Sequence, residues 1–131
     1  MGIRENSRVL IVDDNRDVTR ALTILLRDEG YDPVAFHTAE SAGKFIQDYR
    51  PDVALLDIHL PDQSGLELAV LLRQRHGNEL PIVIFSGDTS IDMLRASTDA
   101  GATHFFGKPV NISSLLDFLD AMTSNKTATP A

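Results

Sequence analysis

Short apolar runs and segments with helical spacing alternate along this chain, and that alternation restricts its possible folds more than any other feature. The first run covers residues 9–12 and is apolar at every position, which is typical of a strand buried on both faces. A segment with helical spacing follows it, and the pair recurs until five strand–helix units are complete. This order predicts an α/β doubly wound fold, in which right-handed crossovers place helices on both faces of one parallel sheet.

Proline, glycine and asparagine mark where several of these elements begin, end or lie. Pro33 lacks an amide hydrogen for the sheet ladder and therefore places the second strand at an edge. Gly30 is expected to end the first helix, and Asn111 to cap the last one, which runs through Met122. Strands are expected over residues 9–12, 31–36, 53–56, 82–85 and 104–106, and helices over 18–29, 39–49, 64–75, 91–99 and 112–122.

The length of 131 residues suits a single domain. The expected elements fill residues 8–122 without an internal boundary or a low-complexity tract. Residues 1–7 are interpreted as an N-terminal lead-in, and the small polar residues 123–131 as a flexible tail or the stub of a linker.

The chain is acidic, since 12 basic and 19 acidic residues give a formal net charge of −7. An acidic surface repels the phosphate backbone, so we expect no direct contact with nucleic acid. The absence of cysteine excludes disulfides and thiolate zinc sites. No apolar run approaches the roughly 18 residues of a membrane span, and residues 1–8 lack the apolar core of a signal peptide. These features predict a cytoplasmic protein that does not enter a membrane.

Five polar residues follow the ends of the expected strands: Asp13 and Asp14 the first, Asp57 the third, Ser86 the fourth and Lys108 the fifth. The carboxyl ends of parallel strands share one edge of the sheet, so these side chains are expected to meet. Two carboxylates about 4 Å apart repel by roughly 4 kcal/mol at an effective dielectric constant near 20. Either the pKa values of the acids rise or a cation binds, and an all-oxygen site suits Mg²⁺.

Asp57 has a second expected role, as a nucleophile. A carboxylate beside Mg²⁺ can attack a phosphoryl group and become an acyl phosphate. Lys108 would then neutralise the phosphoryl oxygens, while the hydroxyl of Ser86 donates to one of them. Taken singly, Asp13 and Asp14 could be a helix cap, Ser86 a turn residue and Lys108 a surface charge, but the combination favours a site.

The sequence resembles the receiver (CheY-like) domains of two-component response regulators over about residues 7–122. The motifs that carry the resemblance are VLIVDD at residues 9–14, LLDIHLPD at 55–62 with Gly65, FSG at 85–87 and GKP at 107–109. All of them occur in order and at the proper spacing. The resemblance implies a flavodoxin-like (βα)5 fold with strand order 2-1-3-4-5, which agrees with an edge position for the strand that contains Pro33.

The resemblance also implies that Asp57 is the phosphoacceptor, with a sensor histidine kinase or a histidine phosphotransfer protein as the donor. Such a protein assists its own phosphorylation and dephosphorylation but is not an enzyme acting on other substrates. The implied ligands are, for Mg²⁺, Asp13, Asp14, Asp57 and the backbone carbonyl of His59, and, for the phosphoryl group, Ser86 and Lys108.

Phe105 lies three residues before Lys108, where the family carries its switch aromatic residue, often Tyr and sometimes Phe. Its ring would turn inward as Ser86 moves toward the phosphoryl group. This motion would reshape the face made by the fourth helix, the fifth strand and the last helix, for partner binding or homodimer formation. A downstream protein target or a missing C-terminal output domain would respond to it. The Lys108–Pro109 peptide bond is expected to be cis.

His59 and Asp88 each lie two residues after a member of the expected site, Asp57 and Ser86 respectively. A solvent-exposed loop residue is the simpler interpretation of His59. Both side chains would nevertheless flank the path by which water reaches the acyl phosphate. We therefore expect them to tune dephosphorylation, in a direction that the sequence leaves open.

Three alternative functions use some of the same features. A Mg²⁺-dependent aspartyl phosphatase of the haloacid-dehalogenase type needs Asp-x-Asp, whereas Ile58 and His59 follow Asp57. A flavin-binding flavodoxin-like protein needs a neutral phosphate loop, where this chain has Asp13 and Asp14. A degenerate receiver would bind proteins without being phosphorylated, and the filled key positions argue against it.

Overall fold

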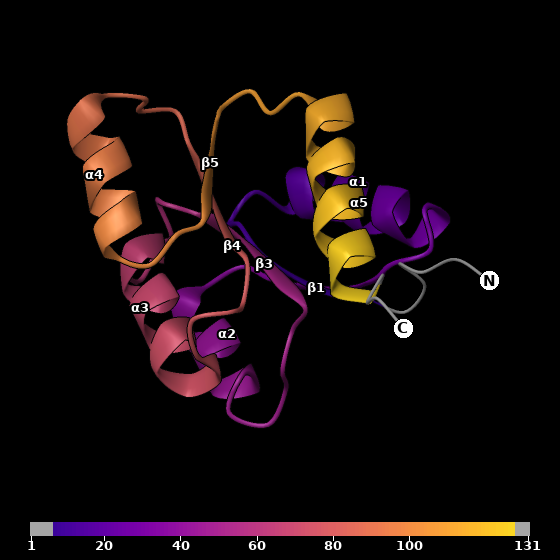
Figure 1. The fold of residues 1–131 in the computed structure, drawn as a ribbon. Coiled ribbons are helices and arrows are strands. Elements are labelled where there is room, and N and C mark those ends of the chain that lie inside the picture. The colour runs from indigo at the N-terminus through magenta and orange to yellow at the C-terminus, as the bar shows by residue number, and fades with distance from the viewer. Residues whose placement is uncertain (1–6, 128–131) are drawn as a thin grey trace.

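A five-stranded parallel sheet forms the centre of the computed structural model, which describes residues 7–127, with side chains through Thr123 (Figure 1). The strand order is β2-β1-β3-β4-β5, so the predicted fold class and order are confirmed. Pro33 lies in β2 at one edge of the sheet, as expected for a residue that cannot donate a ladder hydrogen bond. The strands are β1 (Arg8–Val12), β2 (Asp32–Phe36), β3 (Val53–Asp57), β4 (Ile82–Ser86) and β5 (His104–Gly107).

Five helices cover the two faces of the sheet (Figure 1). α1 and α5 lie on one face, and α2, α3 and α4 lie on the other. None of the helices within residues 7–127 combines the length and the apolar character that crossing a bilayer requires. The bounds are α1 (Arg16–Asp28), α2 (Ala39–Phe45), α3 (Gly65–His76), α4 (Ile91–Asp99) and α5 (Ile112–Thr127).

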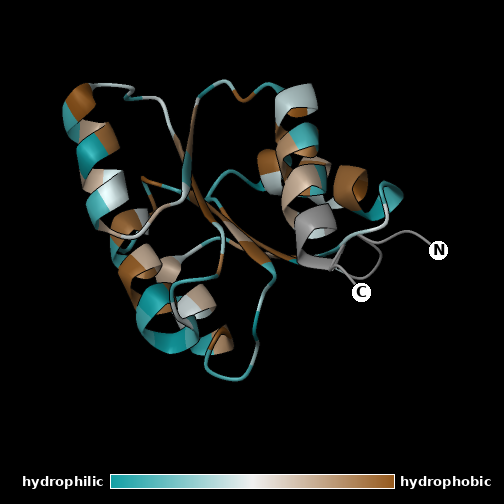
Figure 2. Cartoon of the chain, viewed as in Figure 1, coloured by the Kyte–Doolittle hydropathy of each residue, from teal (hydrophilic) through white to brown (hydrophobic). Residues whose placement is uncertain are grey.

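Alternate residues of the central strands belong to two separate hydrophobic cores. In β1, Leu10 and Val12 pack with α2 and α3, whereas Val9 and Ile11 pack with α1 and α5. The central strands are consequently hydrophobic along almost their whole length (Figure 2). Burial of each large aliphatic side chain contributes roughly 1.5 to 3 kcal/mol, so the two cores hold the sheet and its carboxyl edge rigid.

The second helix is shorter than its apolar spacing predicts, because α2 ends at Phe45 instead of residue 49. The amides of Gln47 and Asp48 donate to the carbonyls of Lys44 and Phe45, three residues back, so the α-helical pattern gives way to tighter turns. The ring centroids of Phe45 and Tyr49 still lie 4.5 Å apart. The spacing that suggested a longer helix thus reflects a ring contact across these turns.

The last helix is longer than predicted. It runs through Thr127 instead of ending at Met122, so part of the expected tail is helical. Thr123 is 2% exposed and its hydroxyl donates to the carbonyl of Leu119 at 2.9 Å, and this burial favours continuation of the helix. The rest of the expected tail, and the lead-in before Ser7, lie outside the described residues.

Asn15 caps the N-terminus of α1. Its side-chain oxygen accepts hydrogen bonds from the amides of Asp17 at 3.0 Å and Val18 at 3.2 Å. The alternative in which Asp13 and Asp14 serve only as the helix cap is therefore wrong. Because Asn15 fills the cap position, neither carboxylate is the N-cap of α1.

The chain passes very close to itself at Gly65, the first residue of α3. The amide of Gly65 donates to the carbonyl of Ile58 at 2.8 Å. A β-carbon at this position would collide with the backbone carbonyl oxygen of Asp57. Only glycine fits here, and it determines how the chain turns from β3 into α3 directly after Asp57.

We expect Gly65→Ala to lower the free energy of unfolding by about 2 to 3 kcal/mol, because the backbone must shift to admit the methyl group. Gly87→Ala is the matched control, since a β-carbon at Gly87 would meet open space. Its effect should stay within about 0.5 kcal/mol. Urea denaturation of both variants checks this expectation, and equal losses would contradict the steric explanation.

Candidate functional site

The five polar residues at the strand ends lie together at the carboxyl edge of the sheet. Asp13 and Asp14 follow β1, Asp57 and Ser86 end β3 and β4, and Lys108 follows β5. These strands are neighbours in the order β1-β3-β4-β5. Parallel pairing with all carboxyl ends at one edge brings residues from four distant segments into one place.

Three carboxylates form the centre of this site. Asp13, Asp14 and Asp57 each offer an oxygen, and these oxygens lie within 4.8 Å of one another. Asp13 and Asp57 are buried, at 2% and 4% exposure, whereas Asp14 is exposed. Asp13 is fixed further because its Oδ1 accepts a hydrogen bond from the amide of Asn15 at 2.9 Å. The cluster therefore has a rigid buried part and one side open to solvent.

Lys108 is the cation of the cluster. Its Nζ lies 2.9 Å from Oδ1 of Asp57 and 3.4 Å from Oδ2 of Asp13. With all four groups ionised, three negative charges and one positive charge leave a net charge of −2. One lysine therefore does not neutralise the cluster.

Burial and the excess negative charge both disfavour ionisation of Asp57. Burial raises the pKa of Asp57; the hydrogen bond from Lys108 opposes the rise, and the charges of Asp13 and Asp14 add to it. Burial acts to lower the pKa of Lys108, but the contacts with Asp57 and Asp13 outweigh it, so that pKa is raised. Lys108 is thus held in its charged form, while the charge on Asp57 is disfavoured until a further cation arrives.

The donor set fits a hard divalent cation. The cluster consists of carboxylate oxygens, carries excess negative charge and includes an exposed member. Mg²⁺ takes oxygen ligands and keeps several of its waters, so a partly open acidic cluster suits it. Asp13, Asp14 and Asp57 are the side chains that could hold such an ion.

Ser86 is fully buried at the end of β4. Its Oγ accepts a hydrogen bond from the amide of Asp88 at 3.0 Å, and its backbone carbonyl accepts one from the amide of Lys108 at 2.8 Å. The hydroxyl hydrogen of Ser86 remains available to a group in the site. The Lys108–Pro109 peptide bond is cis.

His59 and Asp88 are both exposed and lie in the two loops that follow β3 and β4. The hydrogen bonds from Ser90 hold the pKa of Asp88 below its ordinary value, and the charge of His59 contributes in the same direction. The two side chains are therefore close enough to interact electrostatically. The other histidines have partners elsewhere; for example, Nε2 of His37 lies 3.0 Å from Oγ1 of Thr19.

Phe105 lies on β5 and is half-buried against the core beneath α2, α3 and α4. A cavity of about 290 Å³ between α4 and β5 borders its ring, with Ser97 and Thr103 among the lining residues. The ring has no hydroxyl to bond on the surface. It therefore has both an apolar environment and adjacent space.

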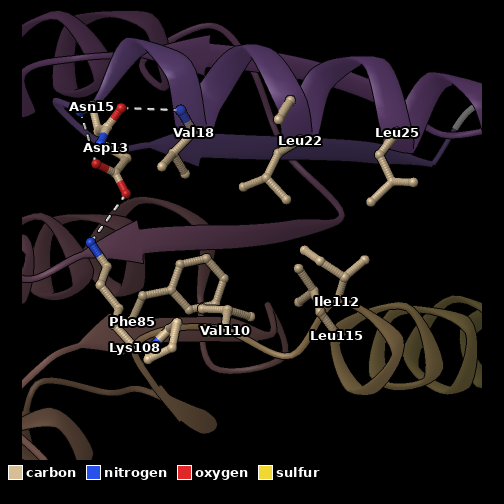
Figure 3. Close-up of a pocket in the computed structure, with 12 residues that line it drawn as sticks. Asp13, Asn15, Val18, Leu22, Leu25, Phe85, Lys108, Val110, Ile112 and Leu115 are labelled. Atoms are coloured by element: carbon tan, nitrogen blue, oxygen red, sulfur yellow. Dashed lines mark hydrogen bonds and ion pairs between the residues drawn. The ribbon is translucent and has the colours of Figure 1, made fainter.

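An apolar groove separates α1 from the start of α5 next to the carboxylates (Figure 3). Its volume is about 860 Å³, and Asp13 and Lys108 lie at one end of it (Figure 3). The groove and the carboxylate cluster thus share two residues. The apolar side chains facing each other across it are Val18, Leu22 and Leu25 on one side and Phe85, Val110, Ile112 and Leu115 on the other.

The contacts of two residues near the site, Asn15 and Asp62, were missed from the sequence. Asn15 could have been found, because asparagine is a favoured N-cap and stands directly before a segment with helical spacing. Asp62 could not: its carboxylate accepts hydrogen bonds from the amides of Ala39 and Glu40, which lie 23 and 22 residues earlier. No local pattern reports such a contact.

Comparison with known proteins places this geometry in a family. Residues 9–120 match the family model of the response regulator receiver domain. The DNA-binding response regulator MtrA of Mycobacterium tuberculosis H37Rv is 31% identical over 124 residues, covering 95% of this chain and 54% of MtrA. Response regulator MprA of Mycobacterium ulcerans is 35% identical over 115 residues, covering 88% of this chain and 49% of MprA.

Solved structures agree with the family match. A CheY-like receiver domain from Methanospirillum hungatei has a TM-score of 0.87 and 29% identity, covering 93% of this chain and 97% of that one. Chemotaxis protein CheY4 of Vibrio cholerae has a TM-score of 0.83 and 28% identity, covering 89% and 98% of the two chains.

The fold and the acidic edge of the sheet define a signalling domain of the two-component class, generally non-catalytic. Domains of this class bind Mg²⁺ at an acidic pocket, and the carboxylate cluster of this chain could hold such an ion. The chain belongs to the family of response regulator receiver domains. It spans about half the length of the curated relatives it matches. The match to receivers sets aside the dehalogenase-type and flavin-binding alternatives.

Without divalent metal, we expect Asp57→Asn to raise the free energy of unfolding at pH 7 by about 1 kcal/mol. The pKa of Asp57 is raised in the folded protein, so its stabilising contribution is present below the unfolded pKa and is lost as the pH rises through the folded pKa. The asparagine side chain of the variant does not titrate and undergoes no such loss. The advantage of the variant should therefore grow from acidic to neutral pH.

Urea denaturation in EDTA at a series of pH values measures this difference. Asp48→Asn controls for the general effect of removing one negative charge from an acidic chain, because Asp48 is exposed and lies outside the cluster. Equal gains in the two variants, or a loss in Asp57→Asn, would contradict the account of the site.

Proposed function

We propose that this domain takes a phosphoryl group on Asp57 from the phosphohistidine of a sensor histidine kinase or a histidine phosphotransfer protein. The observation that carries the proposal is the cluster of three carboxylates with Lys108, whose Nζ lies 2.9 Å from Asp57. A nucleophile, a neutralising ammonium group and the donors for a cation thus occur together, which is what phosphoryl transfer needs.

The proposed Mg²⁺ ligands are Asp13, Asp14, Asp57 and the backbone carbonyl of His59. The short oxygen–oxygen separations among the three acids and the raised pKa of Asp57 support this assignment. When bound, Mg²⁺ would neutralise the acids and the oxygens of the incoming phosphoryl group. Lys108 alone leaves negative charge on the cluster, which is the reason to expect the ion.

In the proposed transfer, a carboxylate oxygen of Asp57 attacks phosphorus. A P–O bond forms as the P–N bond of the donor breaks, and the electron pair of that bond goes to the imidazole nitrogen. Lys108 shifts its ammonium group from Asp57 toward a phosphoryl oxygen, and the hydroxyl of Ser86 donates to another. Hydrolysis later removes the phosphoryl group: water attacks phosphorus, the bond between phosphorus and the Asp57 oxygen breaks, and phosphate and the Asp57 carboxylate are released.

His59 and Asp88 are proposed to tune that hydrolysis. Both are exposed in the loops beside the site, and their charges interact. Side chains in these positions can admit, orient or exclude the attacking water. Neither side chain is proposed as a ligand of the phosphoryl group.

The proposed output is a change in the face formed by α4, β5 and α5. Movement of Ser86 toward the phosphoryl group would let the ring of Phe105 turn inward, and the adjacent cavity of about 290 Å³ provides room for such motion. Ile91 and Leu94 of α4 are 66% and 40% exposed, so this helix offers apolar contacts to a partner or to a second copy of the chain.

The proposed partners on the output side are a downstream protein target or a C-terminal output domain. A C-terminal output domain is supported by MtrA and MprA, because the match to this chain covers only about half the length of each of these relatives. The receiver domain itself is proposed not to contact nucleic acid, in keeping with its net charge of −7, and to act in the cytoplasm. The apolar groove beside Lys108 supports a protein as the phosphoryl donor.

Incubation with acetyl phosphate and Mg²⁺ should increase the intact mass by one phosphoryl group. Asp57→Asn and addition of EDTA should each abolish the gain, because they remove the nucleophile or the cation. Asp48→Asn should be modified like the parent, since Asp48 lies outside the cluster.

If the parent protein gains no mass under conditions that modify a known receiver, a second test uses a phosphorylated histidine phosphotransfer protein as the donor. No transfer there either would contradict the proposal. It would favour a degenerate receiver that binds proteins without being phosphorylated.

A further inference from the structure

Asp62 lies in the connection between β3 and α3, but its carboxylate contacts a different element. Oδ1 accepts a hydrogen bond from the amide of Ala39 at 2.9 Å, and Oδ2 accepts one from the amide of Glu40 at 2.8 Å. These are the first two amides of α2. The hydrogen bond from Ala39, with that from Glu40, holds the pKa of Asp62 below its ordinary value. Both carboxylate oxygens are therefore used to join the loop to α2.

α2 also has an N-cap residue next to it in the sequence, which accepts from a different amide. Thr38 is the N-cap residue, and its hydroxyl accepts a hydrogen bond from the amide of Ser41 at 3.1 Å. Thr38 thus serves the third amide of α2, while Asp62 serves the first two. Because Asp62 belongs to a different segment, its contact also bears on the loop that carries it.

That loop begins directly after Asp57 and contains His59. Its base is closed where the amide of Gly65 donates to the carbonyl of Ile58 at 2.8 Å, and where His59 forms a β-bridge with Ser64. Between these points residues 61–63 are exposed, whereas Leu60 is half-buried against the core beneath α2, α3 and α4. Asp62 supplies the hydrogen bonds that join the exposed stretch to α2.

We propose that Asp62 is a positioning residue for Mg²⁺ binding, because it holds the β3–α3 loop against α2 and so keeps the backbone carbonyl of His59 in place. This inference rests on the proposed function, in which that carbonyl is a ligand. A ligand carried by an ordered loop loses less conformational freedom on binding. Residues that orient metal ligands in this way commonly change metal affinity by about 10-fold or more when replaced.

Isothermal titration of the full chain with Mg²⁺ tests the inference directly. Asp62→Ala should raise the dissociation constant roughly tenfold, and Asp62→Asn, which keeps one acceptor oxygen, should raise it less. Thr38→Val is the matched control, because it removes the other cap of the same helix and leaves the loop intact. It should lower stability to urea, yet leave the Mg²⁺ dissociation constant within about twofold of the parent.

Phosphorylation by acetyl phosphate gives a second measurement on the same variants. In Asp62→Ala, the Mg²⁺ concentration for half-maximal phosphorylation should rise in parallel with the dissociation constant. The maximal rate at saturating Mg²⁺ should stay near that of the parent, since Asp62 touches no reacting atom.

Equal weakening of Mg²⁺ binding in Thr38→Val and Asp62→Ala would overturn the inference, because the effect would then follow the stability of α2. An unchanged dissociation constant in the Asp62 variants would overturn it too. Should Asp62→Ala fail to fold, Asp62→Asn is judged by the same criteria. A parent that binds no Mg²⁺ would overturn the proposed metal site itself, whereas a binding parent with unaffected variants would overturn the role of Asp62 alone.

Discussion

Repulsion among three carboxylates within 4.8 Å of one another is the constraint on which the rest of this site depends. Two of the acids, Asp13 and Asp57, are almost fully buried, so water screens them poorly. The ammonium group of Lys108 and the amide of Asn15 offset part of the cost. Burial, together with the charge that remains, raises the pKa of Asp57. The same excess charge makes the cluster receptive to a cation.

The fold tolerates this arrangement because the sheet is held from both sides. Two apolar cores, one beneath α1 and α5 and one beneath α2, α3 and α4, fix the strands whose ends carry the acids. Two residues then determine the local backbone geometry at the carboxyl edge of the sheet. Asn15 takes over the cap of α1, and Gly65 lets the chain pass close behind Asp57. The loops that follow β3 and β4 carry the exposed residues His59 and Asp88 beside this edge.

The fold and the five residues of the site could be predicted from the sequence, because both depend on local patterns. Buried parallel strands are continuous apolar runs, their carboxyl ends share one edge, and Pro33 marks the strand that tolerates an edge position. Resemblance to receiver domains supplied the strand order and the roles of the residues. The chemical roles of the five site residues, like those of His59, Asp88 and Phe105, remain predictions.

The ends of two helices and one contact between distant segments could not be predicted. α2 ends at Phe45 although its apolar spacing continues, and α5 extends beyond residue 122, where Thr123 is buried. The contact of Asp62 with the start of α2 joins residues more than 20 positions apart. Periodicity reports which face of an element is apolar, and it does not report which element lies against that face.

The most direct test of the account is an NMR titration of the side-chain carboxyl carbon of Asp57, first without metal and then with Mg²⁺. The account predicts that the pKa of Asp57 lies above the ordinary value for aspartate in the metal-free protein, since burial and two neighbouring acids disfavour its charge. Mg²⁺ should lower that pKa well below the ordinary value. An ordinary pKa under both conditions would contradict the claim that charge repulsion at this edge creates the site.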